Sequence, residues 1–284
     1  MLKKILVPLT GADTDSAALA AAFAVAGNFN AHVNALFVRI DPRDAVPVMG
    51  EGLSGALIEE IMRAAETEAN RDAEVARQQF QVACNAAKAE LVETPPGPDA
   101  VSAALRERLG SADEVVAREG RLADLIVLPK PKHDPSMITL EAAMLGTARP
   151  LLMAPPSVPT RIGSTVAIAW NGGIESARAV SAAMPFLVQA DAVHVLTAET
   201  SATRGEEADQ LTDYLAWHGV QVRTSRFKSL GAPVGATLLN RAGELGADLL
   251  VMGGYGHSRM RELILGGVTR HVLAYAEMPI LLAH

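Results

Sequence analysis

Residues 123–128 read Ala-Asp-Leu-Ile-Val-Leu, and residues 247–252 read Ala-Asp-Leu-Leu-Val-Met. Each copy has the length and apolar character of a β-strand. Each is followed by a loop, a helix-like stretch and a second apolar run, at 149–154 or at 278–283. Self-similarity of this kind is the mark of a duplicated unit. The repeat therefore predicts two related domains, and 284 residues are enough for two cores.

The starts of the two halves also correspond. Residues 5–11 (Ile-Leu-Val-Pro-Leu-Thr-Gly) parallel residues 166–172 (Val-Ala-Ile-Ala-Trp-Asn-Gly). Between the halves stands Pro-Pro-Ser-Val-Pro-Thr, residues 155–160, a composition typical of a linker. We therefore divide the chain into a first domain, 1–156, and a second domain, 162–284.

Short apolar runs alternate with amphipathic stretches in both halves. The runs are almost continuously hydrophobic, as in parallel strands that are covered on both faces. We expect strands near 4–9, 31–38, 101–107, 124–128 and 150–154, and again near 165–170, 191–197, 220–226, 248–252 and 279–283. An Ala-rich helix should follow the first strand of each half, near 15–27 and 175–188. The alternation predicts a doubly wound α/β sheet in each half.

The first half contains a long excursion, residues 41–100, that the second half lacks. It begins with a loop containing Pro and Gly, residues 41–55, and ends with Thr-Pro-Pro-Gly-Pro at 94–98. A helix of about 30 residues is expected between them, from its apolar spacing. We interpret the loop as a connection, and a lid over a pocket is the alternative.

Composition excludes several classes of protein. The chain is 49% hydrophobic and 20% charged, which is typical of a globular protein. Its net charge of −7 argues against a general nucleic-acid binder. The single cysteine, Cys84, permits no disulfide within the chain and is expected to be a small buried hydrophobe. No apolar stretch reaches transmembrane length, so we expect a soluble cytoplasmic protein without a membrane partner.

Glycines follow the second copy of the repeat. Residues 253–257 read Gly-Gly-Tyr-Gly-His, and Gly266 and Gly267 precede a second helix-like stretch. The loop follows the carboxyl end of a parallel strand, which is where open α/β sheets bind ligands. Glycines let a phosphate approach backbone N–H groups, and a helix N-terminus attracts anions. Together these features predict a phosphate site.

Other motifs with known chemistry do not fit this chain. The loop lacks the Gly-Lys-Ser/Thr of a P-loop and the third glycine of the dinucleotide fingerprint. The seven histidines show no metal-ligand spacing, and no Gly-x-Ser-x-Gly occurs. Asp13 and Asp15 follow the first strand and are expected to cap the next helix. Trp170 is expected in the core, with packing beside an adenine as the alternative.

The glycine spacing carries a family resemblance. Gly253-x2-Gly256-x9-Gly266 is similar to the ATP-binding motif G-x2-G-x9-G-(S/T) of the universal stress protein family. The flanking segments 247–252 and 279–282 also resemble that family, as does 123–128. The resemblance implies two tandem domains with five-stranded parallel sheets, in the fold shared with adenine nucleotide α-hydrolases. It also implies dimer-like pairing of the two domains within the chain. Pairing of two chains is left open.

The resemblance further implies an adenine nucleotide, ATP or a relative, in the second domain, with Mg²⁺ beside its phosphates. The expected phosphate contacts are Gly253, Gly256, His257, Gly266, Gly267, Val268 and Thr269. The expected adenosine contacts are Ala169, Asn171 and Thr197. The sequence departs from the motif twice: Gly267 replaces the Ser/Thr, and Asn171 replaces an acidic residue.

The first half departs from the motif completely. Pro129 and Lys132 stand where the second half has Gly253 and Gly256. Prolines remove N–H donors, so we interpret this half as a structural or regulatory partner without a nucleotide. Lys130, Lys132 and His133 are expected in a solvated loop, with anion binding as the alternative.

Two other functions stay open at this point. The chain could be an interaction protein that acts through its domain-pairing surfaces without a nucleotide. It could also be a slow ATP hydrolase or an adenylyl transferase. No residue in the sequence stands out as a general base, so no catalytic residue is assigned.

Overall fold

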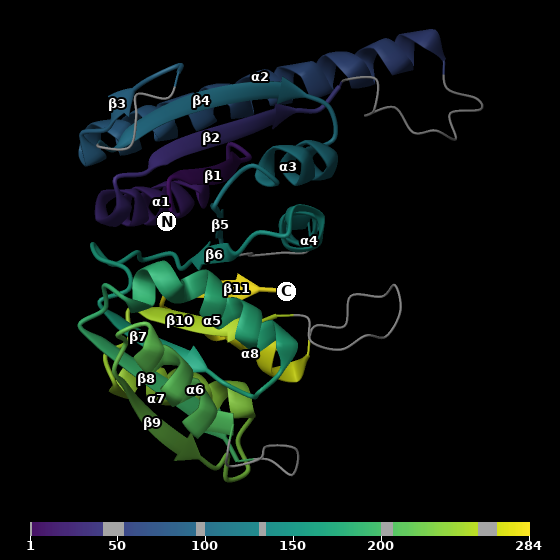
Figure 1. Cartoon of the computed structure of the whole chain (residues 1–284). Helices are drawn as coiled ribbons and strands as arrows, with labels where there is room; N and C mark the ends of the chain where they lie inside the picture. The colour runs from purple at the N-terminus through teal and green to yellow at the C-terminus, as the bar shows by residue number, and fades with distance from the viewer. Residues whose placement is uncertain (1, 42–53, 95–99, 131–134, 200–206, 255–265) are drawn as a thin grey trace.

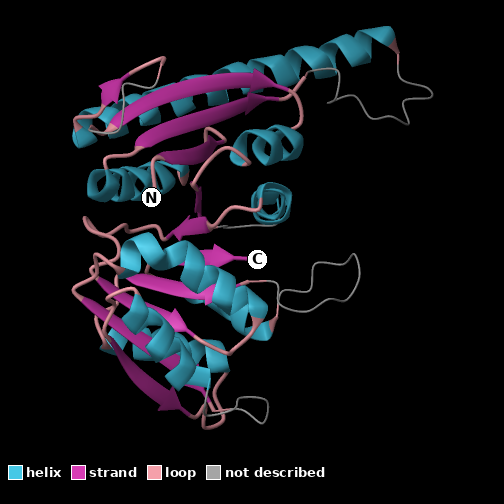
Figure 2. Cartoon of the chain, viewed as in Figure 1, coloured by secondary structure: helices cyan, strands magenta, loops and turns pink. Residues whose placement is uncertain are grey.

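The computed structural model describes residues 2–41, 54–94, 100–130, 135–199, 207–254 and 266–284. Within them, 11 strands form one sheet in the order β3-β4-β2-β1-β5-β6-β11-β10-β7-β8-β9, with helices on both faces (Figures 1 and 2). The strands are β1 Lys4–Leu9, β2 His32–Arg39, β3 Glu90–Leu91, β4 Ser102–Leu109, β5 Leu125–Pro129, β6 Leu151–Ala154, β7 Thr165–Ala169, β8 Ala192–Ala198, β9 Val222–Phe227, β10 Leu249–Gly253 and β11 Ile280–Ala283. The helices are α1 Asp15–Phe29, α2 Gly55–Ala87, α3 Ala112–Gly120, α4 Pro135–Thr147, α5 Ile174–Leu187, α6 Glu207–Trp217, α7 Val234–Glu244 and α8 Gly267–Tyr275.

Every strand expected from the apolar runs is present, within two residues at each end. The first half also contains β3, which pairs in parallel with the start of β4. The sequence does not reveal β3, because its two residues, Glu90 and Leu91, are exposed and form no apolar run. The α/β fold is confirmed, with six strands in place of five in the first half.

The two halves join through their last strands. β6 and β11 pair in antiparallel fashion, with Leu152 opposite Leu281, while the other described strand pairs are parallel. Both of these leucines are fully buried. The pairing expected from the family resemblance is therefore a strand-to-strand contact that makes the sheet continuous between the halves (Figure 1).

Side chains alternate between two cores, one on each face of the sheet. One core contains residues of α1, α2, α5 and α6, and the other contains residues of α3, α4, α7 and α8. In β7, Ile168 belongs to the first core and Ala167 to the second, as the two-residue period of a strand requires. Trp170 continues the alternation and packs on the α5/α6 face.

The repeated aspartate has the same structural role in both halves. The Asp124 carboxylate accepts the backbone N–H groups of Lys3 and Lys4 at 2.8 and 2.9 Å. The Asp248 carboxylate accepts the N–H groups of residues 163–165 at 2.9 to 3.1 Å. Each aspartate thus fixes the start of the neighbouring central strand, β1 or β7. This explains the aspartate in both copies of the repeat.

The excursion of the first half forms α2, a helix of 33 residues that packs against α1. Its buried residues include Phe80 and Cys84, and burial raises the pKa of the Cys84 thiol to about 11. Cys84 is therefore the buried hydrophobe that the sequence predicts. None of the helices within the described ranges combines the length and the apolar character that spanning a membrane would need.

α2 also covers the turn that follows β1. The Gln79 side chain donates to the carbonyl of Ala12 at 3.1 Å. Gly11 has a φ of +81°, and a Cβ placed there would lie 2.6 Å from the carbonyl oxygen of Asp72. Only glycine fits this turn, because both the backbone conformation and the approach of α2 exclude a side chain.

Candidate functional site

The predicted site residues gather at the carboxyl edge of the second half of the sheet. Parallel pairing aligns Met252 of β10 with Ala169 of β7, and Ala169 with Leu196 of β8. The next residues along each strand, Gly253, Trp170 and Thr197, therefore lie side by side at one edge. Ligands of open α/β sheets bind at this edge.

The N-terminus of α8 lies open at the same end of the second half. Gly266 is its N-cap, and no side chain of the described residues caps the helix. The first hydrogen bond of the helix runs from the Arg270 N–H to the Gly266 carbonyl at 2.9 Å, so the N–H groups of Gly267, Val268 and Thr269 precede it. A Cβ placed at Gly266 or Gly267 would meet no atom of the described residues within 4 Å. N–H donors at a helix N-terminus, with space in front of them that the described residues leave open, suit an anion.

Gly253 has a different reason to be glycine. A Cβ placed there would lie 2.6 Å from both the carbonyl carbon of Glu175 and the backbone nitrogen of Ser176. The end of β10 thus packs directly against the first turn of α5, whether or not a ligand binds. Gly256 and His257, which the resemblance also assigns to phosphate, lie outside the described residues.

Asn171 forms part of the turn that leads into α5. Its Oδ1 accepts the N–H of Gly173 at 2.9 Å, and Gly172 between them has a φ of +73°. This is the side-chain turn that Asn and Asp favour after a strand. One of the two polar groups of the Asn171 amide is therefore already engaged within the turn.

Thr197 presents the opposite situation. It is buried, and its Oγ1 has no hydrogen-bond partner among the residues that the structure describes. An unpaired buried hydroxyl costs about 1–3 kcal/mol of stability. A position that keeps such a group is a candidate for contact with a bound molecule.

Comparison with known proteins assigns a family to the second half. A sequence model of the universal stress protein family matches residues 165–284. The second half is a universal stress protein domain. No curated protein sequence matches the chain significantly. The match confirms, for residues 165–284, the family predicted from the glycine spacing.

Solved structures extend the likeness to the whole chain. A universal stress protein from Archaeoglobus fulgidus DSM 4304 superposes with a TM-score of 0.66 at 15% identity, over 99% of this chain and 95% of that one. A protein from Pseudomonas aeruginosa UCBPP-PA14, named as a universal stress protein, superposes with a TM-score of 0.55 at 16% identity, over 99% and 93%. At these identities the likeness concerns the fold. The shared fold extends over both halves of the chain.

In the first half, the turn between β1 and α1 forms hydrogen bonds to a buried side chain of the protein itself. The Asp15 carboxylate is fully buried and accepts the N–H groups of Thr10 and Gly11 at 2.7 and 2.8 Å. Burial raises its pKa to about 6, although these hydrogen bonds act in the opposite direction. The expectation that Asp15 caps α1 is wrong in detail, because Thr14 is the N-cap and Asp15 binds the preceding turn. The donors of this turn are thus occupied by the protein itself.

Lys130 belongs to the contact between the halves. Its Nζ donates to the Ala276 carbonyl at the C-cap of α8, at 3.1 Å, and burial lowers its pKa. A cation at a helix C-terminus is favourable, because the last carbonyls carry partial negative charge. The expectation of a solvated Lys130 is therefore wrong, and this residue connects the first half to the universal stress protein domain. Lys132 and His133 lie outside the described residues.

Proposed function

We propose that the universal stress protein domain binds one adenine nucleotide, ATP or a close relative, at the carboxyl edge of β7, β8 and β10. The observation that supports this most is the open, uncapped N-terminus of α8. The protein supplies three N–H donors there, and among the described residues no side chain fills the space in front of Gly266 and Gly267. Such an arrangement is the usual phosphate site of an α/β fold.

Each residue would have a definite part in this complex. The N–H groups of Gly267, Val268 and Thr269 would donate to phosphate oxygens. Asn171 and Thr197 would flank the adenosine, and the Thr197 hydroxyl offers a polar group with no other described partner. Mg²⁺ would accompany the phosphates, since it binds nucleotides mainly through phosphate oxygens and water. We assign binding to this site and no chemical step.

The first half should not bind a second nucleotide. Pro129 ends β5 where the second half has Gly253, and proline offers no N–H. The donors of the β1–α1 turn are held by Asp15, and α2 contacts Gly11 in that turn. Three separate features thus close the edge that is open in the second half. The expected stoichiometry is one nucleotide per chain.

Isothermal titration of the full chain with ATP, with and without Mg²⁺, tests the proposal. Gly267→Val places a branched side chain in the open space before α8, and binding should weaken at least tenfold. Gly243→Val in α7 is the matched control, because a Cβ there also meets nothing within 4 Å. It should bind as the natural chain does. Absence of binding at about 1 mM ATP, a very weak affinity, would refute the proposal.

A second function is favoured by two of the same residues. Gly253 is explained by packing against α5, and the Asn171 Oδ1 by its turn, so neither requires a nucleotide. The domain could then serve as an interaction module that retains the family loop without using it. The titration separates the two functions, because only the nucleotide proposal predicts saturable binding that Gly267→Val removes.

A further inference from the structure

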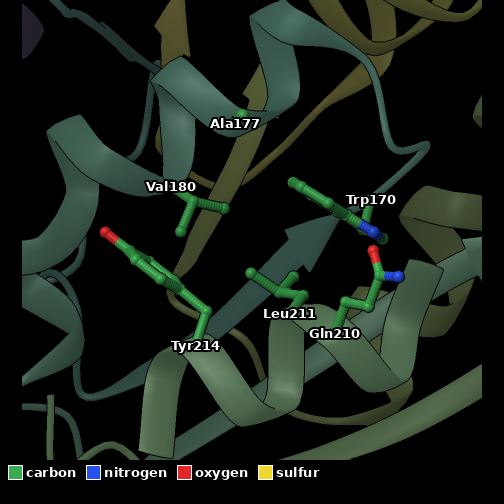
Figure 3. Close-up of a pocket in the computed structure, with 6 residues that line it drawn as sticks. All are labelled: Trp170, Ala177, Val180, Gln210, Leu211 and Tyr214. Atoms are coloured by element: carbon green, nitrogen blue, oxygen red, sulfur yellow. The ribbon is translucent and has the colours of Figure 1, made fainter. Parts of the chain in front are cut away.

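A pocket of about 350 Å³ opens between α5 and α6 in the second half (Figure 3). Six residues from β7–α5 and α6 line it: Trp170, Ala177, Val180, Gln210, Leu211 and Tyr214. α5 and α6 pack on one face of the sheet, whereas α8 packs on the other. The pocket is therefore separate from the open N-terminus of α8.

The lining has a consistent chemistry. Figure 3 shows the Trp170 indole and the Tyr214 ring toward opposite ends of the pocket, with Leu211 between them and the Gln210 amide beside the indole. None of the six residues carries a charge. Apolar walls with two aromatic rings and one amide suit a neutral molecule with a hydrogen-bonding group, and the volume lies within the usual range of ligand pockets. These six residues offer no positive group to a phosphate.

The duplicated fold shows why this space is open. In the first half, the 33-residue helix α2 packs against α1 and buries Ala76 and Phe80 there. In the second half, α6 has only 11 residues, and α5 and α6 scarcely contact each other along their described parts. Leu9 stands where Trp170 stands in the second half, and it is 4% exposed. The described residues of the second half leave open the position that the first half fills with α2.

A second observation points to a ligand at the same place. Ala169 pairs with Leu196, so Trp170 and Thr197 are neighbours on adjacent strands. Val195 of β8 lies in the core under α5 and α6, and the strand period places Thr197 on the same face. The Thr197 Oγ1 is buried without a described partner. The Thr197 hydroxyl, which is buried and without a partner among the described residues, therefore lies next to the Trp170 end of the pocket.

We propose that this pocket binds a small, uncharged aromatic molecule, with its ring between Trp170 and Tyr214 and a polar substituent near Gln210. This pocket lies on the α5/α6 face and shares Thr197 with the adenosine end of the proposed nucleotide site. Because Trp170 directly precedes Asn171 in the chain, an occupied pocket would also contact the segment that forms the nucleotide edge.

Fluorescence can test the pocket directly with the neutral probe N-phenyl-1-naphthylamine. The chain has two tryptophans, and Trp217 is 88% exposed, so Trp217→Phe leaves Trp170 as the single emitter with little effect on folding. In this background the probe should bind saturably, about one per chain, and should quench Trp170 by energy transfer. Failure to bind up to the solubility limit of the probe would overturn the proposal.

Two exposed alanines provide a matched pair of variants. Ala177→Phe places a ring in the mouth of the pocket and should weaken probe binding at least tenfold. Ala216→Phe adds the same ring to α6 at an exposed position outside the lining and should leave binding unchanged. Tyr214→Ala removes one wall and should also weaken binding. Equal binding by all three variants would show that the probe binds elsewhere and would overturn the proposal.

Discussion

The buried carboxylate of Asp15 makes the stability of the first half depend on pH in an unusual direction. Its folded-state pKa is about 6, against an ordinary value of 3.8. The folded chain therefore binds more protons than the unfolded chain between these values. Asp15 stabilises the fold most at low pH, and this contribution is lost as the pH rises through 6.

The size of the effect follows from the two pKa values. One pKa unit corresponds to about 1.4 kcal/mol. Between about pH 5 and about pH 7.5, the folded carboxyl releases almost all of its proton while the unfolded one is already ionised. The difference in proton binding between the folded and unfolded chains, summed over this interval, is equivalent to roughly one pKa unit, or about 1.4 kcal/mol of unfolding free energy. Solvent screening does not reduce it, because the Asp15 side chain is fully buried.

Urea unfolding of Asp15→Asn at the two pH values measures this term. Asparagine keeps the shape, and its oxygen can accept the N–H groups of Thr10 and Gly11, but it does not titrate. The variant should gain about 1.4 kcal/mol relative to the natural chain on going from pH 5 to pH 7.5. Asp13→Asn, at an exposed neighbour, controls for the loss of one surface charge. An unchanged difference between variant and natural chain at both pH values would refute the reasoning.

The remaining predictions concern glycines and the contact between the halves. Gly253→Ala should destabilise the chain by about 1–3 kcal/mol in urea unfolding, because its Cβ would overlap backbone atoms of α5. Gly267→Ala should leave the free energy of unfolding unchanged or raise it by up to about 1 kcal/mol. Equal losses of stability in the two glycine variants would contradict the packing argument. Lys130→Met should cost about 1 kcal/mol through the lost bond to the Ala276 carbonyl. Lys228→Met removes an exposed ion pair and should leave the free energy of unfolding unchanged. A similar loss of stability in this variant would mean that Lys130→Met acts through the change in net charge and not through the lost hydrogen bond.

The fold was predictable because burial leaves a direct signal in the sequence. Strands covered on both faces need continuous apolar runs, and such runs located every long strand. The repeated Asp124 and Asp248 revealed the duplication before any contact was known. β3 left no such signal, because two exposed residues at a sheet edge need no apolar pattern. The sequence also could not show that β6 and β11 pair, since an apolar strand does not indicate its partner.

The site was predictable at the level of family and place, and less so in the role of each residue. Gly253 and Gly267 are alike in sequence, yet one is required by α5 and the other faces open space. That distinction depends on distances between elements far apart in the chain. Asp15 resembled a helix cap because capping is a local property, whereas its actual partners follow from the turn before it. The pocket between α5 and α6 depends on the length of α6 relative to α2, and only a comparison of the two folded halves shows this.

The antiparallel junction between β6 and β11 lies within one chain, and this determines how the contact between the halves responds to dilution of the protein. Two separate domains that met through these strands would dissociate as their concentration fell. In this chain, a segment of about ten residues, 155–164, connects the end of β6 to the start of β7 and keeps the two halves together. A tether of that length corresponds to an effective concentration in the millimolar range. The two halves therefore remain assembled in a fixed one-to-one ratio at any cellular abundance. Because each half always meets the same other half, the two contact surfaces can diverge in sequence as a matched pair.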